Sequence, residues 1–170
     1  MSGCLFTRID GNAIFLSGYN RRAAITQNEF VWLGQSAIAS WGRTDEWDGT
    51  GGQQPRFTRV AGNLAHEIGN LQKQSSFYFS AASCQATLEG NIVYNIPRAA
   101  INVDDGFGGG NEFVSNLLYN TCRESRWVWG AVCARGSKAA SSCSHFLRSP
   151  APFLSPSSSR CSDHGAFNVR

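Results

Sequence analysis

The sequence predicts an all-β protein, a right-handed parallel β-helix of about four to five coils that is incomplete at both ends. Two observations predict this fold. A motif that starts with asparagine recurs at intervals typical of one solenoid coil, and a second short apolar run follows it each time. One coil of a solenoid cannot bury its apolar face alone, so we expect the stacking of neighbouring coils to build the core.

The recurrent motif has asparagine at its first position and apolar residues after it. It reads Asn28-Glu-Phe-Val-Trp-Leu-Gly, Asn63-Leu-Ala-His-Glu-Ile-Gly, Asn91-Ile-Val-Tyr-Asn-Ile-Pro and Asn116-Leu-Leu-Tyr-Asn-Thr-Cys, and a fifth copy starts at Cys4. From Cys4 onward the steps between copies are 24, 35, 28 and 25 residues. The longest step contains a Gly/Asp/Gln-rich stretch, residues 44–56, which predicts an extruded loop. A propeller blade needs about 40–45 residues, more than these steps provide.

Each coil also contains a second run with alternating side chains, at residues 13–16, 37–41, 76–79 and 100–103. Alternation in a strand sends successive side chains to opposite faces. We expect one outward column of Phe15, Ala39, Tyr78 and Asn102, and a second of Ser17, Trp41, Ser80 and Asp104. A third short run, at residues 24–25 and 87–88, completes three strands per coil. The recurrent asparagine suits a tight turn, and stacked side-chain amides can hydrogen-bond from coil to coil.

The charge distribution argues against a nucleic-acid partner. Residues 1–125 hold nine Lys or Arg and eleven Asp or Glu, a net charge of 9 − 11 = −2. No apolar stretch reaches the roughly 18 residues that a membrane span requires. The first twenty residues do not read as a signal peptide, so the sequence predicts no compartment. No cysteine pair has zinc-site spacing, and we expect no cofactor.

The repeat breaks after residue 125. Residues 126–161 are rich in Ser, Pro and Ala, contain five Lys or Arg and no acid, and include three prolines that exclude a regular strand. Two interpretations stay open: a disordered loop, or a translated intron, since Arg126-Trp127 and the pyrimidine-rich codons available for residues 152–159 fit splice signals. Residues 162–170 then resume the β-helix pattern.

Three segments carry a family resemblance. They are Ser36-Ala-Ile-Ala-Ser-Trp-Gly, Val60-Ala-Gly-Asn-Leu-Ala-His-Glu-Ile-Gly and Asn102-Val-Asp-Asp-Gly-Phe-Gly-Gly-Gly-Asn. The chain resembles the right-handed parallel β-helix proteins of eukaryotic microbes and algae over residues 4–125, and again at Asp163-His-Gly-Ala-Phe-Asn. The resemblance implies the fold and a distant relation to polysaccharide-active β-helix proteins. It transfers no catalytic residue.

The outward face of the second run is the first candidate site. Trp41, Tyr78, Asn102 and Phe107 are the candidate ligand-binding residues, because aromatic rings pack on sugars and polar groups bind their hydroxyls. The candidate partner is therefore a polysaccharide.

Candidate catalytic residues lie near that face. Asp104 and Asp105 could form an acid/base pair, bind calcium, or simply belong to the turn before Gly106. Lys73 and Arg98 are either bases for proton abstraction beside a uronate or solvated surface charges.

Three other groups contain acidic residues and are weaker candidates. His66-Glu67 lacks the H-E-x-x-H spacing and is expected to be a hydrogen-bonded pair on the coil surface. The acids at 45, 46 and 48 either rim a groove with Trp47 or solvate the extruded loop, and Asp163 with His164 could join a site near the last coil.

Three functions remain open from the sequence. The first is a carbohydrate-active lyase, hydrolase or epimerase, the second a non-catalytic glycan-binding or surface-structural module, and the third a truncated inactive product. An enzyme should bring Asp104 or Asp105 within hydrogen-bonding distance of Lys73, Arg98 or His66 in a concave groove. A binder should present a flat aromatic strip with dispersed charges.

Overall fold

The computed structural model describes residues 1–44, 51–104, 109–121, 132–133 and 167–169, and every regular element in these ranges is a β-strand. The strands are β1 (Leu5–Ile9), β2 (Ile14–Ser17), β3 (Ala24–Thr26), β4 (Glu29–Leu33), β5 (Ile38–Trp41), β6 (Arg59–Ala61), β7 (Leu64–His66), β8 (Tyr78–Ala81), β9 (Thr87–Glu89), β10 (Ile92–Tyr94), β11 (Ile101–Asp104), β12 (Glu112–Val114), β13 (Leu117–Tyr119), β14 (Val132–Cys133) and β15 (Phe167–Val169).

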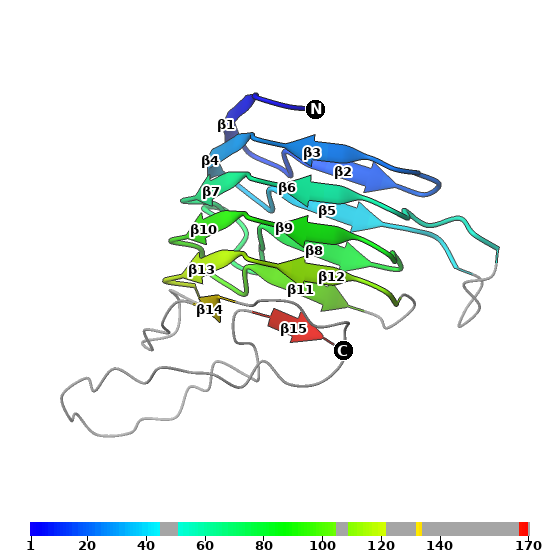
Figure 1. The fold of residues 1–170 in the computed structure, drawn as a ribbon. Helices are drawn as coiled ribbons and strands as arrows, with labels where there is room; N and C mark the ends of the chain where they lie inside the picture. Colours follow the sequence, from blue (N-terminus) through cyan, green and yellow to red (C-terminus); the bar gives the residue numbers. More distant parts are fainter. Residues whose placement is uncertain (45–50, 105–108, 122–131, 134–166, 170) are drawn as a thin grey trace, which may run out of the picture.

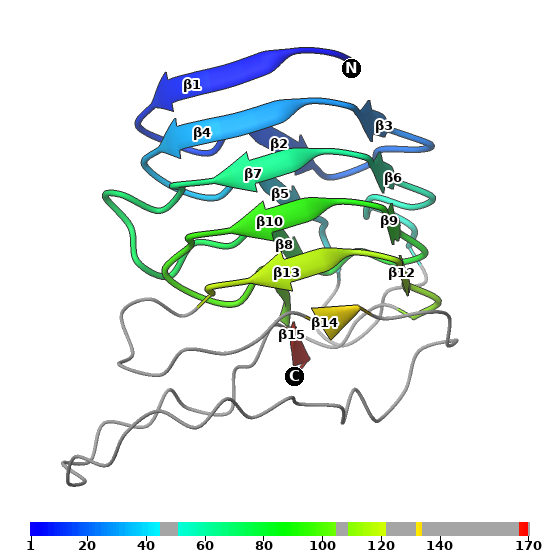
Figure 2. The ribbon, with the colours of Figure 1, turned by 60° about the vertical axis from the view of Figure 1, so that its left-hand side comes forward.

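The strands form three sheets that run along one solenoid (Figures 1 and 2). Their orders are β1-β4-β7-β10-β13-β14, β2-β5-β8-β11-β15 and β3-β6-β9-β12. Each coil gives one strand to each sheet, and strand pairing between successive coils is parallel. The predicted parallel β-solenoid of about four coils is confirmed.

The core consists of columns of equivalent side chains from successive coils. The inward columns are Phe30, Ala65, Val93 and Leu118 in the first sheet, Ile14, Ile38, Tyr78 and Ile101 in the second, and Ile25, Val60 and Leu88 in the third. These side chains form one buried cluster. The ring of Phe6 also stacks on that of Phe30, with centroids 4.9 Å apart. Coil-on-coil packing therefore supplies the apolar contact that a single coil lacks.

The recurrent asparagines form a buried ladder along the solenoid. Asn91 shows the pattern: its Oδ1 accepts hydrogen bonds from the backbone N–H and the Nδ2 of Asn63, both at 3.0 Å. Its own Nδ2 donates to the carbonyl of Val60 at 3.0 Å. In the same way, the Oδ1 of Asn63 accepts from the backbone N–H and Nδ2 of Asn28, and the Oδ1 of Asn116 accepts from those of Asn91. At the start of the ladder, the N–H of Cys4 donates to the Oδ1 of Asn28. The predicted coil-to-coil amide bonding is confirmed.

The corners of the coils are columns of residues with left-handed backbone. The residue before each ladder position has φ between 54° and 65°: Gly3, Gln27, Gly62, Gly90 and Ser115. A second column is Arg8, Trp32, Glu67, Asn95 and Asn120, and a third is Arg22, Phe57, Gln85 and Gly110. Left-handed backbone costs an L-residue roughly 1–2 kcal/mol. The coil shape therefore requires this conformation even where the residue is not glycine.

The expected register of the second run is wrong in one coil. Tyr78 pairs with Ile38 and Ile101, and Phe79 is the residue that aligns with Ala39 and Asn102. Tyr78 is 2% exposed and belongs to the core. Three consecutive aromatic residues, 77–79, remove the alternation on which the prediction relied.

Near its end the chain adds two strands to the solenoid. β15 pairs in parallel with β11, with Phe167 opposite Ile101, and β14 pairs antiparallel with β13. Most of the predicted insert, residues 126–161, lies outside the described residues. Its two interpretations stay predictions.

We expect Asn91→Ala to lower the free energy of unfolding by about 3–5 kcal/mol, because several buried polar groups lose their partners at about 1–3 kcal/mol each. Asn70→Ala is the control, since Asn70 is exposed and its side chain donates one hydrogen bond, to the carbonyl of Glu67. Chemical denaturation of both variants measures the difference. Equal losses would contradict a stabilising ladder.

Gly90→Ala should cost about 1 kcal/mol through the backbone alone. A Cβ at Gly90 meets nothing within 4 Å, but φ there is +60°. A Cβ at Gly11 also meets nothing within 4 Å, and Gly11 has no left-handed φ. Gly11→Ala should therefore leave stability unchanged or slightly raised. The same denaturation measurement compares the two, and an unaffected Gly90→Ala variant would show that the corner tolerates other backbone conformations.

Candidate functional site

The outer face of the β1-β4-β7-β10-β13 sheet carries a strip in which three coils repeat the same kinds of side chain. We call it the β7–β10–β13 strip. Its residues are Leu64, His66 and Glu67 in the first coil, Ile92, Tyr94 and Asn95 in the second, and Leu117, Tyr119 and Asn120 in the third. The parallel register aligns each residue with its equivalent, so the strip consists of an apolar, an aromatic and a polar column.

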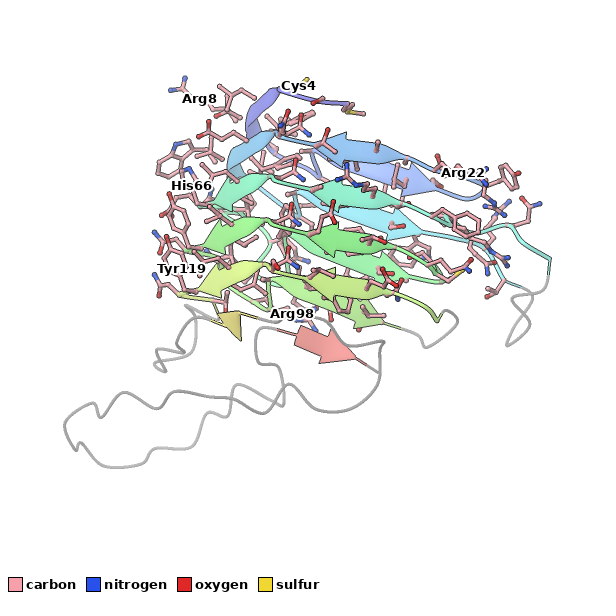
Figure 3. The ribbon with its side chains drawn as sticks, viewed as in Figure 1. Cys4, Arg8, Arg22, His66, Arg98 and Tyr119 are labelled. Atoms are coloured by element: carbon pink, nitrogen blue, oxygen red, sulfur yellow. The ribbon has the colours of Figure 1, made fainter. Side chains whose placement is uncertain are left out.

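The aromatic column is a continuous stack. The His66 and Tyr94 rings have centroids 4.9 Å apart and planes 2° apart, and Tyr94 and Tyr119 follow at 5.0 Å and 9°. Figure 3 shows His66 and Tyr119 on the outer side of the sheet. Because ring faces are turned toward one another, the stack offers solvent mainly ring edges. A tyrosine hydroxyl is the ring atom farthest from the backbone, so hydroxyls lie along this outer rim.

The polar column is a chain of side-chain hydrogen bonds. The Nδ2 of Asn95 donates to Oε1 of Glu67 at 2.7 Å, and the Nδ2 of Asn120 donates to Oδ1 of Asn95. All three residues have left-handed backbone, with φ of 50°, 52° and 48°. The shared conformation places the three side chains at the same position in each coil. The column is therefore ordered before any ligand arrives.

The apolar column borders the stack on its other side. Ile92 is 42% exposed and Leu117 is 38% exposed, while Leu64 is half-buried. Single exposed aliphatic side chains are common on protein surfaces, but here they align in one row beside a row of rings. The strip thus has an apolar and a polar edge that run parallel to the solenoid axis.

Carboxylates dominate the charge near the first coil of the strip. The Oε1 of Glu29 lies 3.6 Å from Nε2 of His66, a contact that becomes an ion pair when the imidazole is protonated. Glu67 is the second carboxylate. The two neighbours His66 and Glu67 each contact a residue of an adjacent coil, Glu29 and Asn95. The surface position that we predicted for the pair is correct, and both residues belong to a larger array.

The predicted catalytic residues lie around the two ends of strands in the β2-β5-β8-β11-β15 sheet. Asp104 ends β11, where its Oδ2 accepts a hydrogen bond from Nδ2 of Asn102 at 3.4 Å. Lys73 precedes β8 and Arg98 precedes β11, at the starting ends of these strands. Asp104 and the pair Lys73 and Arg98 therefore come at opposite ends of these strands along the chain. Asp105 lies outside the described residues. The catalytic roles of these residues stay predictions.

The predicted ligand-binding residues have different environments. Trp41 is 51% exposed and contacts the ring of Phe79, with centroids 5.7 Å apart. Tyr78 is buried on the inner face, and Asn102 is also fully buried. Phe107 lies outside the described residues. Of the three described residues, Trp41 alone is accessible, so Trp41, Tyr78 and Asn102 do not form one exposed surface.

The sequence contained a signal for the strip that we did not use. An aromatic residue followed by a polar one occurs three and four residues after the ladder asparagine, as His66-Glu67, Tyr94-Asn95 and Tyr119-Asn120. Its recurrence at a fixed offset distinguishes it from a chance pair.

No group of three or more His, Cys, Asp or Glu side chains that could hold a metal occurs among the residues the structure describes. The same part of the chain contains no helix long and apolar enough to cross a membrane.

No family model, curated protein or solved structure matches the chain. The fold and the strip therefore define the class, a parallel β-solenoid with a repeated aromatic and amide surface. The narrower resemblance to microbial and algal β-helix proteins remains an expectation.

The core position of Tyr78 predicts a loss of stability at alkaline pH. Burial raises the pKa of Tyr78 above its ordinary value of about 10, because the phenolate is poorly solvated there, and neighbouring serine hydroxyls oppose the shift only in part. The folded state then holds the proton more tightly than the unfolded state. Stability is fully present below pH 10 and falls as the pH rises above it, by at most about 1.4 kcal/mol per pH unit.

Denaturation between pH 8 and 11.5 tests this expectation. Tyr78→Phe should remove part of the alkaline loss, whereas Tyr19→Phe, at an exposed tyrosine, should retain it. If Tyr78→Phe and the unmodified protein lose stability in parallel, Tyr78 does not control the alkaline transition.

Proposed function

We propose that the protein binds an extended polysaccharide lengthwise along the β7–β10–β13 strip. The observation that carries the proposal is the repetition of one set of side chains in three successive coils, with ring centroids 4.9 and 5.0 Å apart. The residue length of an extended, equatorially linked sugar chain is similar to this spacing. Each coil can then meet one sugar residue in the same way.

The chemistry of the strip suits the two surfaces of a sugar ring. A pyranose has apolar C–H faces and a rim of hydroxyls. The C–H groups fit against Ile92 and Leu117, and the hydroxyls fit the tyrosine rims and the amides of Asn95 and Asn120. Since the ring faces in the stack are largely covered by one another, hydrogen bonding at the ring edges takes the place of face-on stacking.

The favoured ligand is an uncharged polysaccharide. Glu29 and Glu67 place two carboxylates beside the first coil of the strip. A polyuronate would bring a carboxylate with every residue, and like charges in close contact are unfavourable. This argument disfavours the uronate substrates that a lyase at Lys73 or Arg98 would require.

Binding is favoured over catalysis by the distribution of the groups. An acid/base mechanism requires its groups within hydrogen-bonding distance of one reacting bond. Asp104 lies at the opposite end of its strand from Arg98, and neither belongs to the strip. The strip itself repeats along the axis, as a surface for a repetitive ligand should.

Affinity electrophoresis against a panel of neutral and anionic polysaccharides tests the proposal. At least one neutral, extended polysaccharide should retard the protein. Tyr119→Ser should weaken that interaction by about tenfold, the effect of losing about 1.4 kcal/mol of contact. Tyr94→Phe, which keeps the ring and removes its hydroxyl, should weaken it less.

Phe15→Ser is the matched control, because Phe15 is an exposed aromatic residue on another sheet. Its variant should bind like the unmodified protein. The proposal fails if no neutral polysaccharide retards the protein, or if Phe15→Ser and Tyr119→Ser reduce binding equally.

A further inference from the structure

Two arginines lie side by side at the corner where the first two coils turn from the second sheet to the third. Arg21 precedes β3 and Arg56 precedes β6, and the two residues form an isolated parallel bridge. Neighbouring strands are about 4.8 Å apart, so the two side chains leave the backbone close together and on the same side. Both residues are half-buried.

This arrangement is electrostatically unfavourable unless an anion accompanies it. Like charges directly opposite each other destabilise a strand pair, and partly desolvated charges require partners. Two ion pairs in the described part of the chain join Arg59 with Glu89 and His66 with Glu29. Neither includes an arginine of the corner.

The guanidinium of Arg21 is held by neutral groups. It donates hydrogen bonds to the carbonyl oxygens of Asn20, Gly52 and Gln54, at 3.0, 2.7 and 2.5 Å. It also lies 4.0 Å from the centroid of the Tyr19 ring. These contacts fix its position and leave its full positive charge in place.

The side chain of Arg56 contains a buried hydrogen-bond donor. Its Nε is shielded from solvent and has no hydrogen-bond partner among the residues that the structure describes. A buried donor without a partner is uncommon in a folded protein. A bound anion would supply the acceptor that the Nε–H of Arg56 lacks in the described part of the chain.

A third arginine and two aromatic rings surround the pair. Arg22 is exposed and lies over the Phe57 ring, 5.5 Å from its centroid. Tyr19 and Phe57 are themselves exposed. Figure 3 shows Arg22 at the end of the solenoid cross-section opposite His66, so this corner is separate from the β7–β10–β13 strip.

From these observations we propose that Arg21 and Arg56 bind an oxyanion, a sulfate or carboxylate group. The Nε–H of Arg56 and the N–H groups that Arg21 does not donate to the backbone are the donors for such an anion, and the backbone contacts of Arg21 fix its position. The site goes beyond the proposed function, because it lies on another side of the molecule and binds an anion, whereas the strip favours an uncharged ligand. Its ligand is either a free inorganic anion or an anionic group on a glycan.

Sodium sulfate is the probe, titrated against sodium chloride at constant ionic strength and followed by calorimetry and thermal unfolding. Sulfate should bind saturably and raise the melting temperature. Arg56→Gln should remove this effect, and Arg98→Gln, at a half-buried arginine on another corner, should retain it. If Arg56→Gln fails to fold, Arg56→Lys keeps the charge without the paired donors and should weaken binding by about tenfold. The absence of saturable sulfate binding, or unchanged affinity in the folded Arg56 variant, would overturn the proposal.

Two further arms identify the source of the anion. A sulfated polysaccharide that competes with sulfate while its desulfated form does not would assign a glycan-borne group, and sulfate binding without such competition would assign a free anion.

The extruded loop carries acids at 45, 46 and 48, outside the described residues. If sulfate binds only after these three are changed to Asn, Gln and Asn, the chain's own carboxylates occupy the site and an external ligand is ruled out.

Discussion

The side-chain amide of the ladder asparagine is the constraint on which the rest of the structure depends. At Asn63, Asn91 and Asn116 it accepts two hydrogen bonds from the preceding coil and donates one to a backbone carbonyl of that coil, so it fixes how the two coils align. Side chains alternate between faces, and a slip of one residue would turn every inward side chain outward. The core columns, the β7–β10–β13 strip and the arginine pair all require this single register.

The ladder also explains how the solenoid accepts coils of different length. The bonds that join Asn28 with Asn63 span 35 residues, and those that join Asn91 with Asn116 span 25. Their lengths are nearly the same, 2.9 and 3.0 Å. Additional chain leaves at the corner after β5 and returns before β6, where Arg21 bonds the carbonyls of Gly52 and Gln54. The insertion thus creates the braced corner that we propose as an anion site.

The sequence was sufficient to predict the fold because its main determinant is a repeated residue with one physical role. Asparagine at a fixed position indicated the coils, and the apolar runs indicated the strands. The left-handed corners were not predictable in the same way, since Gln27 and Phe57 carry none of the usual signals for positive φ. The predicted register of the second sheet was wrong at Tyr78 for two reasons. A loop of variable length separates this strand from the ladder asparagine, and residues 77–79 are all aromatic. The alternation of apolar and polar residues therefore cannot show which of the three points inward.

The candidate site was harder to predict because its contacts join different coils. His66 and Glu67 suggested a local pair, whereas their partners are Glu29 and Asn95, more than 25 residues away in the sequence. A surface of this kind is visible only when each coil is aligned on its ladder asparagine. The predicted catalytic residues Asp104 and Arg98 lie at the end of β11 and before its start. Residue type alone could not show that separation.

The central claim is that the buried amide ladder holds the coils in register. Hydrogen exchange of the asparagine side-chain NH₂ groups, followed by NMR, measures this most directly. The account predicts slow exchange for Asn63, Asn91 and Asn116, whose Nδ2 atoms are buried and bonded on both sides or to a backbone carbonyl. The exposed amide of Asn70 should exchange rapidly. Exchange of the ladder amides as fast as that of Asn70 would contradict the account.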